Sequence, residues 1–241
     1  MTNPNALQWF KRRRNGYNPL DELGTLGALW DFSVGVTDVG GGVDSILDQT
    51  GRGNTLTAPA AGNRPTYTVS DADFNGQSTG TGDGTDDGIR KASISMGGAF
   101  APGTMILVAK QVTNTVSDAM MSVGANSSLI REAAAGTMQA IQGTGGQVTT
   151  TAFLARAHVI AFVANGATIQ LYVDGVAEGA AVAYTGSTVD GSTVGLFSRS
   201  DSPGALPSNC KIAFAAISLT ALSAAQMAAF GDYSRARFGT P

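Results

Sequence analysis

The chain of 241 residues has little of the side-chain chemistry on which many enzyme active sites depend. It holds one cysteine, Cys210, and one histidine, His158, so it can form no disulfide within itself and no zinc site of the Cys/His kind. Only 14% of its residues are charged, and Glu22, Glu132 and Glu178 are its three glutamates. Because helices use glutamate, lysine and leucine heavily, this composition indicates a chain that is not mainly helical.

Charge and hydropathy exclude two further classes of function. The net charge is -3 and the isoelectric point is near 5.0, so no global basic field favours a nucleic-acid partner. No window approaches the roughly 20 apolar residues that cross a bilayer, and the first apolar cluster is too short for a signal peptide. We therefore expect no membrane partner, and a protein that stays inside the cell or leaves it by lysis or in a particle.

Glycine is the residue that the chain has in excess, with 32 in 241, and it separates short apolar stretches. This alternation of short stretches and turns is typical of an all-β sandwich or jelly roll. The expected strands are residues 28–32, 65–69, 105–109, 120–123, 128–132, 137–142, 194–198 and 211–219.

One hairpin and one helix stand out. Residues 158–164 and 167–173 flank Asn165 and Gly166, which predicts a two-residue turn with positive φ at both positions. Near the end of the chain, Ser223 and Gln226 form a capping box, which predicts a helix over residues 224–237 that ends near Gly239.

The first 24 residues differ from the rest, and we interpret them as an N-terminal arm ahead of one domain over residues 25–241. Four basic residues stand in one run among aromatic residues, a composition that suits binding to an acidic partner surface. The predicted partner-binding residues of the arm are Trp9, Phe10, Lys11, Arg12, Arg13, Arg14 and Tyr17.

Several motifs then follow in a fixed order. They are LWDF at residues 29–32, DQTGRGN at 48–54, RPTY at 64–67, DGTDD at 83–87 and LYVDG at 171–175, followed by ALS at 221–223. This order resembles concanavalin A-like lectin/glucanase domains of the laminin-G type, especially those of bacteriophage particle proteins. The resemblance covers residues 26–239 and implies an antiparallel two-sheet jelly-roll sandwich with a short C-terminal helix.

Members of this family include glycosidases, so the question is whether this chain carries the residues of an active site. Laminarinase-type glucanases carry Glu-x-Asp-x-Glu on one strand, and the glutamates of this chain are isolated. His158 is more simply a strand residue with a local hydrogen bond than a triad base, and Cys210 borders an apolar strand without a second cysteine. We expect no catalytic residue, no cofactor and no enzyme.

The densest acidic cluster is Asp83, Asp86 and Asp87, in the DGTDD turn. Carboxylates on a turn can bind calcium, as in laminin-G-like relatives, or can accept backbone N–H groups in a purely structural turn. We favour the structural turn and predict no metal, while the calcium alternative stays open.

Glycan binding generally uses an exposed aromatic ring beside hydrogen-bonding groups. The candidates here are Tyr184, Arg199 and Asp201, the last two at the start of the irregular loop 200–209. Tyr67 and Phe197 are weaker candidates of the same kind.

Two functions remain. The first is a non-enzymatic bacteriophage virion structural protein, a capsid decoration or a tail or fibre component, assembled in the host cytoplasm. We expect it to bind other virion proteins through the arm and to be a homo-oligomer. The alternative is a carbohydrate-binding module for attachment to a host-surface glycan.

Overall fold

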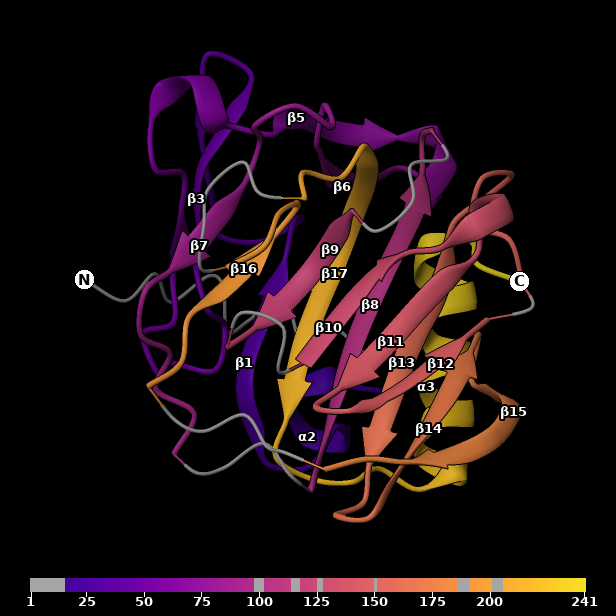
Figure 1. The fold of residues 1–241 in the computed structure, drawn as a ribbon. Coiled ribbons are helices and arrows are strands. Elements are labelled where there is room, and N and C mark those ends of the chain that lie inside the picture. The colour runs from indigo at the N-terminus through magenta and orange to yellow at the C-terminus, as the bar shows by residue number, and fades with distance from the viewer. Residues whose placement is uncertain are drawn as a thin grey trace.

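The structure of the protein is a computed structural model in which antiparallel strands dominate (Figure 1). It describes residues 16–97, 102–113, 118–124, 128–149, 151–185, 191–200 and 206–241. Two sheets face each other, and α3 covers the far side of one of them. None of the helices within these ranges is both long and apolar enough to cross a membrane.

The back sheet, which carries α3, follows the pairing order β15, β14, β13, β8 and β17, then β6 and β1 one after the other along the same edge of β17. Strand β6 continues to β5, β3 and β2. Its strands are β1 (Leu26–Asp31), β2 (Val36–Val39), β3 (Gly42–Ile46), β5 (Thr66–Asp71), β6 (Gln77–Thr81), β8 (Gly103–Gln111), β13 (His158–Ala164), β14 (Thr168–Val173), β15 (Val176–Ala183) and β17 (Cys210–Ser218).

The front sheet follows the order β12, β11, β10, β9, β16, β7 and β4. Its strands are β4 (Leu56–Thr57), β7 (Ile89–Lys91), β9 (Ala119–Val123), β10 (Ser128–Glu132), β11 (Met138–Gln142), β12 (Gly145–Val148) and β16 (Val194–Leu196). The helices are α2 (Pro19–Glu22) and α3 (Ala224–Phe238), with single 3-10 turns η1 (Ala61–Asn63), η2 (Ala72–Phe74) and η3 (Ala134–Gly136).

The two sheets are nearly closed on each other. Strand β3 pairs with both β4 and β5 and so joins them at one edge. At the other edge, the side-chain amide of Gln147 in β12 donates to the carbonyls of Glu178 and Ala180 in β15, the latter at 3.1 Å. These hydrogen bonds satisfy backbone carbonyls that would otherwise be exposed on the free edge of β15.

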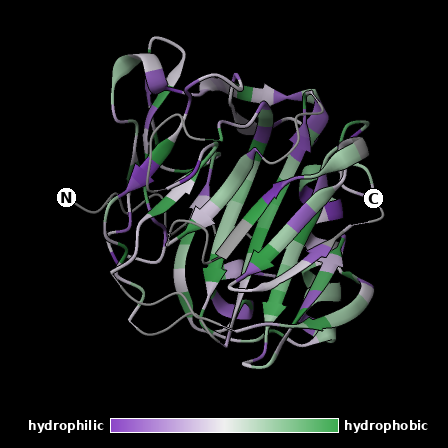
Figure 2. Ribbon diagram, in the orientation of Figure 1, coloured by the Kyte–Doolittle hydropathy of each residue, from purple (hydrophilic) through white to green (hydrophobic). Residues whose placement is uncertain are grey.

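The apolar residues divide between two cores because the back sheet is buried on both faces. In β13, Ile160 and Phe162 face the front sheet, while Val159 and Ala161 face α3. Figure 2 shows the resulting hydrophobic band along the central strands, with hydrophilic residues at several of the turns. A strand buried on both sides is therefore apolar at every position instead of at every second one.

Helix α3 begins and ends as its sequence predicts. Ser223 Oγ accepts the backbone N–H of Gln226 in a complete capping box, and Gly239 ends the helix at φ +72°. In its last turn the guanidinium of Arg237 lies 2.7 Å from the Asp31 carboxylate in β1, and both side chains are almost completely buried. This ion pair fixes the end of the helix against the back sheet.

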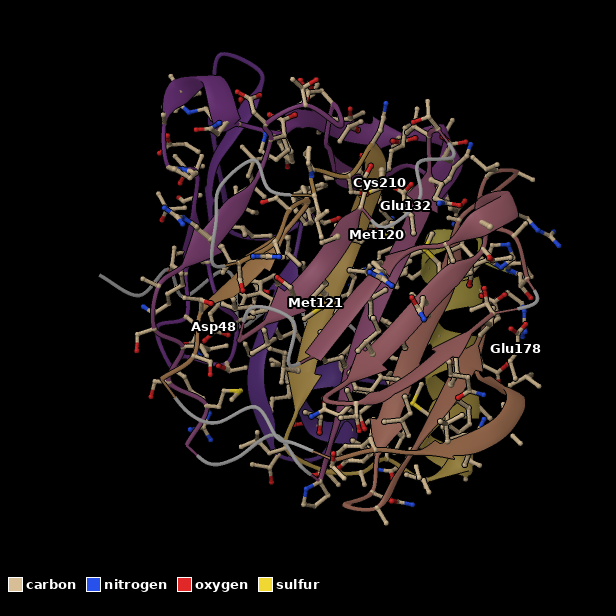
Figure 3. All side chains as sticks on the ribbon, in the orientation of Figure 1. Asp48, Met120, Met121, Glu132, Glu178 and Cys210 are labelled. Carbon is tan, nitrogen blue, oxygen red and sulfur yellow. The ribbon has the colours of Figure 1, made fainter. Side chains whose placement is uncertain are left out.

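The DQTGRGN motif is a structural turn. The Asp48 carboxylate, labelled in Figure 3, accepts the backbone N–H groups of Leu29, Thr50 and Asn54, at 3.0–3.1 Å, and the Thr50 hydroxyl. The Asn54 side chain then bonds to the backbone of both Gly27 and Ser95. The motif thus ties β1 to the segment that follows β7.

Most of the expected strands are confirmed, as is the C-terminal helix, and the main differences concern turns and short polar strands. Asp174 and Gly175 both have positive φ, whereas in the 165–166 turn only Gly166 does, so the expectation for Asn165 is corrected. Instead, the Asn165 side chain accepts the N–H groups of Ala167 and Thr168. We did not predict helix α2 or strands β2, β3, β4, β6, β7, β12 and β15 from the sequence.

The described part of the predicted N-terminal arm, residues 16–24, contacts the domain. Leu23 is fully buried in the core beneath α3, and Tyr17 stacks on Tyr233 with ring centroids 5.0 Å apart. The described residues of the predicted arm therefore pack as part of the folded domain. Trp9, Phe10 and the basic run of residues 11–14 lie outside the described residues.

The Asp48 turn yields a test of stability. In Asp48→Ala, three backbone N–H groups lose a charged acceptor, and we expect a loss of about 2–4 kcal/mol in the free energy of unfolding, measured with urea. Asp232→Ala is the matched control, because Asp232 forms an exposed ion pair with Arg235 on α3 and its loss should cost under about 0.5 kcal/mol. Equal stability of the two variants would contradict the role given to Asp48.

Candidate functional site

The outer face of the front sheet, which points away from the back sheet, carries the most distinctive set of polar side chains. Ile89, Ile130 and Ala140 point into the core between the sheets. Because side chains alternate along a strand, Arg90, Arg131 and Gln139 point to the outer face. Strands β7, β10 and β11 thus hold these three side chains on one surface.

A loop that follows β16 lies across this face. A Cβ on Gly88 would come within 2.3 Å of Ser198 Oγ, and one on Gly195 within 3.0 Å of Ser200 Cα, so both glycines leave the space that the loop needs. The Ser200 N–H donates to Ser122 Oγ at 2.7 Å, which fastens the loop to β9. These contacts hold Arg199, between the two serines, on the outer face as well.

The guanidinium groups of this surface differ in their partners. Arg131 Nε donates to Gln139 Oε1 at 2.8 Å across the β10–β11 ladder. Arg90 is partly buried, and its side chain forms no hydrogen bond or ion pair with the residues that the structure describes. Arg199 is partly buried and interacts with another residue of the chain. We call Arg90, Arg131, Gln139 and Arg199 the arginine face.

The electrostatics of the arginine face favour an anion. Among the described strand residues that point to this side there is no carboxylate. A guanidinium carries five N–H donors in a rigid plane and stays charged at any physiological pH, so it pairs with planar oxyanions through two parallel hydrogen bonds. The face therefore offers hydrogen-bond donors and positive charge on rigid strands.

The structure separates the three predicted glycan residues. Tyr184 is 8% exposed and belongs to the core between the sheets, so its ring is no exposed platform, which corrects that expectation. Arg199 lies on the arginine face, and Asp201 falls outside the described residues. Phe197 is fully buried, and the Tyr67 hydroxyl donates to the Phe32 carbonyl.

Aromatic rings are scarce on the whole described surface. Trp30 and every described phenylalanine are fully buried, and Tyr172 is 8% exposed. Tyr17 and Tyr233 are partly buried against each other and α3. A ligand on the described surface would thus be held by hydrogen bonds and charge more than by stacking.

The acidic turn between β6 and β7 is the place where a metal ion could bind. Ligand oxygens of Asp83, Asp86 and Asp87 lie within 4.8 Å of one another, the first two carboxylates exposed and the third buried. Burial and the charges of Asp83 and Asp86 raise the pKa of Asp87 to about 6, although the N–H of Asp83 donates to it. Asp83 in turn accepts the N–H of Thr85 at 2.7 Å, as in a structural turn.

The three glutamates lie on separate elements, α2, β10 and β15. Figure 3 shows Glu132 near Cys210 at one end of the sandwich and Glu178 at the edge. Glu132 is 1% exposed and accepts the Ser208 hydroxyl at 2.6 Å. Burial raises the pKa of the Cys210 thiol, with the Glu132 and Asp118 charges adding to the effect, so the reactive thiolate is disfavoured.

The single histidine has a structural environment. His158 Nδ1 lies 2.6 Å from the Asp174 carboxylate, whose second oxygen accepts the N–H of Val159 at 2.9 Å. Its ring packs against Phe153. In the part of the chain that the structure describes, no hydroxyl or thiol hydrogen-bonds to this ring, so a nucleophile beside it is absent there.

Comparison with known proteins gives the fold. The chain matches no protein-family profile and no curated protein by sequence. Among solved structures, Trypanosoma rangeli sialidase in complex with the inhibitor DANA matches with a TM-score of 0.63 at 11% identity, over 94% of this chain and 36% of the sialidase. The chain spans about a third of the length of such sialidases.

Two further solved structures also match. Domain 4 of AbnA, a GH43 extracellular arabinanase from Geobacillus stearothermophilus in complex with arabinotriose, gives a TM-score of 0.60 at 16% identity, over 86% of this chain and 98% of that domain. The botulinum neurotoxin serotype D ligand-binding domain with N-acetylneuraminic acid gives 0.59 at 10%, over 87% and 51%. Identities this low show a shared β-sandwich fold alone.

The acidic turn yields a test with a defined pH dependence. Because the folded state raises the pKa of Asp87, it binds the proton more tightly than the unfolded chain, and stability is lost as pH rises from about 4 through about 6. Asp87→Asn removes this cost and keeps an acceptor for the Asp83 N–H. We expect its melting temperature to exceed that of the parent by about 2–4 °C at pH 8 and to match it near pH 4.

Asp38→Asn, at an exposed position in strand β2, is the matched control and should show no such pH-dependent difference. A lower melting temperature of Asp87→Asn at both pH values would contradict the assigned repulsion. A rise in the parent's melting temperature with added calcium that the variant lacks would instead identify the turn as a cation site.

Proposed function

We propose that this chain is a non-catalytic glycan-binding domain of the concanavalin A-like jelly-roll class, and that its arginine face is the binding surface. The observation that carries the proposal is the match to almost the whole of an arabinanase domain solved with arabinotriose. The neurotoxin ligand-binding domain, solved with N-acetylneuraminic acid, adds a second protein of this fold with a sugar ligand.

The arginine face supports the proposal because its chemistry suits saccharides. Arg90 and Arg131, whose Nε is hydrogen-bonded to the Gln139 side chain, supply donors to sugar oxygens, and the Gln139 amide supplies a group that both donates and accepts. Strands hold most of these groups in place, which lowers the entropy lost on binding. A glycan can therefore be bound here although no described aromatic ring is exposed.

A non-catalytic role is part of the same proposal. Retaining hydrolysis needs two carboxyl groups about 5 Å apart, one protonated and one ionised. The described glutamates lie on three different elements, and the close aspartates of the 83–87 turn stand in a loop where two of them are exposed. This distribution supports binding without bond cleavage.

A place on a bacteriophage particle, with residues 1–15 as the anchor, remains a proposal that rests on the sequence motifs. None of the three structures compared above is a virion protein. Deletion of residues 1–15, which leaves Tyr17 and Leu23 in the fold, is the appropriate variant. We expect it to fold normally and to lose association with purified particles by co-sedimentation, whereas full retention would contradict the anchor.

Glycan binding is tested with the full chain on an array of neutral and acidic saccharides. We expect binding to a subset of glycans, weakened at least tenfold in the double variant Arg90→Gln/Arg131→Gln. Arg235→Gln on α3 is the matched control, because Arg235 is exposed and on the far side of the molecule. Absence of binding to every saccharide, or shortening of a bound polysaccharide during incubation, would overturn the proposed function.

A further inference from the structure

We propose that the arginine face selects oligosaccharides that carry carboxylate groups, and that Arg90 and Arg131 each bind one carboxylate. This inference rests on the proposed function and narrows it to a ligand class. It starts from two guanidinium groups on one rigid surface, neither of which forms an ion pair with the described residues.

Arg131 is oriented for a carboxylate. Its Nε is bonded to Gln139 Oε1 at 2.8 Å, so this edge of the guanidinium is occupied by a side chain of the neighbouring strand. The two terminal nitrogens then remain free to donate in parallel, which matches the two oxygens of a planar carboxylate. The amide contact fixes the plane of the guanidinium before the ligand arrives and so reduces the entropy lost on binding.

Arg90 lacks any such contact, and it is only partly exposed. A partly buried charged group without a partner has lost part of its hydration free energy. An anion that pairs with it compensates for this loss. In contrast, fully exposed surface arginines gain little from an ion pair. The partial burial of Arg90 and Arg131 on strands therefore favours specific pairing.

The spacing of the two arginines selects the length of the ligand. Arg90 pairs with Gly195, Gly195 with Ser122, and Ser122 with Leu129 of β10, two residues before Arg131. Three strand spacings of about 4.8 Å separate β7 from β10, or about 14 Å. A single sugar cannot bridge this distance, so the ligand is an oligosaccharide with carboxylates on separate units.

Other polyanions fit the face less well. Nucleic acid is bound with a broad basic field and with aromatic rings that stack on bases, whereas this chain has a net charge of -3 and no exposed aromatic ring among its described residues. Sulfate groups are tetrahedral and match the two parallel donors of Arg131 less closely than a planar carboxylate does. Nucleic acid and sulfated saccharides are therefore both included in the experiment as alternative ligands.

The experiment uses calorimetry on the full chain with a panel of carboxylated oligosaccharides of two to six units. For each, the carboxyl-reduced and the sulfated counterparts are measured as well, and a single-stranded oligonucleotide serves as a competitor. We expect binding that requires the carboxylates, strengthens as the ligand lengthens from two units to several, and weakens as the salt concentration rises.

Single variants test the role of each arginine in binding. Arg90→Gln and Arg131→Gln should each raise Kd about ten- to hundredfold for the carboxylated ligand, and Arg131→Lys should restore part of the loss because it keeps the charge without the paired donors. Gln139→Leu should weaken binding less than Arg131→Gln, since it removes the orientation of the guanidinium and not its charge. Arg235→Gln should leave Kd unchanged.

The outcomes separate this inference from the proposed function. Equal affinity for the carboxylated and carboxyl-reduced saccharides overturns the inference and leaves glycan binding intact. Preference for the sulfated counterpart, or displacement by the oligonucleotide, also overturns it and identifies a different anion. Unchanged Kd in both glutamine variants moves the site away from the arginine face, and absence of binding to any saccharide overturns both proposals.

Discussion

Strand β17 must satisfy two apolar cores at once, and the rest of the structure depends on how it does so. All of its residues except Lys211 are buried. A bulge between Ile212 and Phe214 lets Ala213 and Phe214 both turn to the α3 side, while Ile212 and Ala215 face the front sheet. Because β8 pairs along one edge of β17, and β1 and β6 share the other, this strand sets the register of both cores.

Most of the described aromatic side chains are buried in the two cores. Every described phenylalanine is fully buried, and Phe214 and Phe230 contact each other across the interface between β17 and α3. A chain with 7% aromatic residues that fills two cores has few rings left for its surface. A ligand of the described surface would then meet mainly polar and charged side chains, which is why we place the proposed binding surface at the partly buried arginines on β7 and β10.

Much of the fold could be predicted from the sequence because long apolar runs and caps are local signals. The β13–β14 hairpin and the Ser223 capping box were predicted at nearly their observed bounds. Strand β15 was missed since its small residues show no alternation and it is mostly exposed. The arginine face was missed for a different reason, because Arg90 and Arg131 come together only through the pairing of β16 with both β7 and β9.

The candidate site also shows why loop residues are harder to predict than strand residues. Arg199 was proposed from its place beside an irregular loop, and Tyr184 from its residue type, yet only Arg199 reaches the outer face. Gly88 and Gly195 decide this, because side chains there would displace the two serines that flank Arg199. The position of one candidate binding residue thus depends on one glycine just before β7 and another in β16, a relation that only the packed sheet reveals.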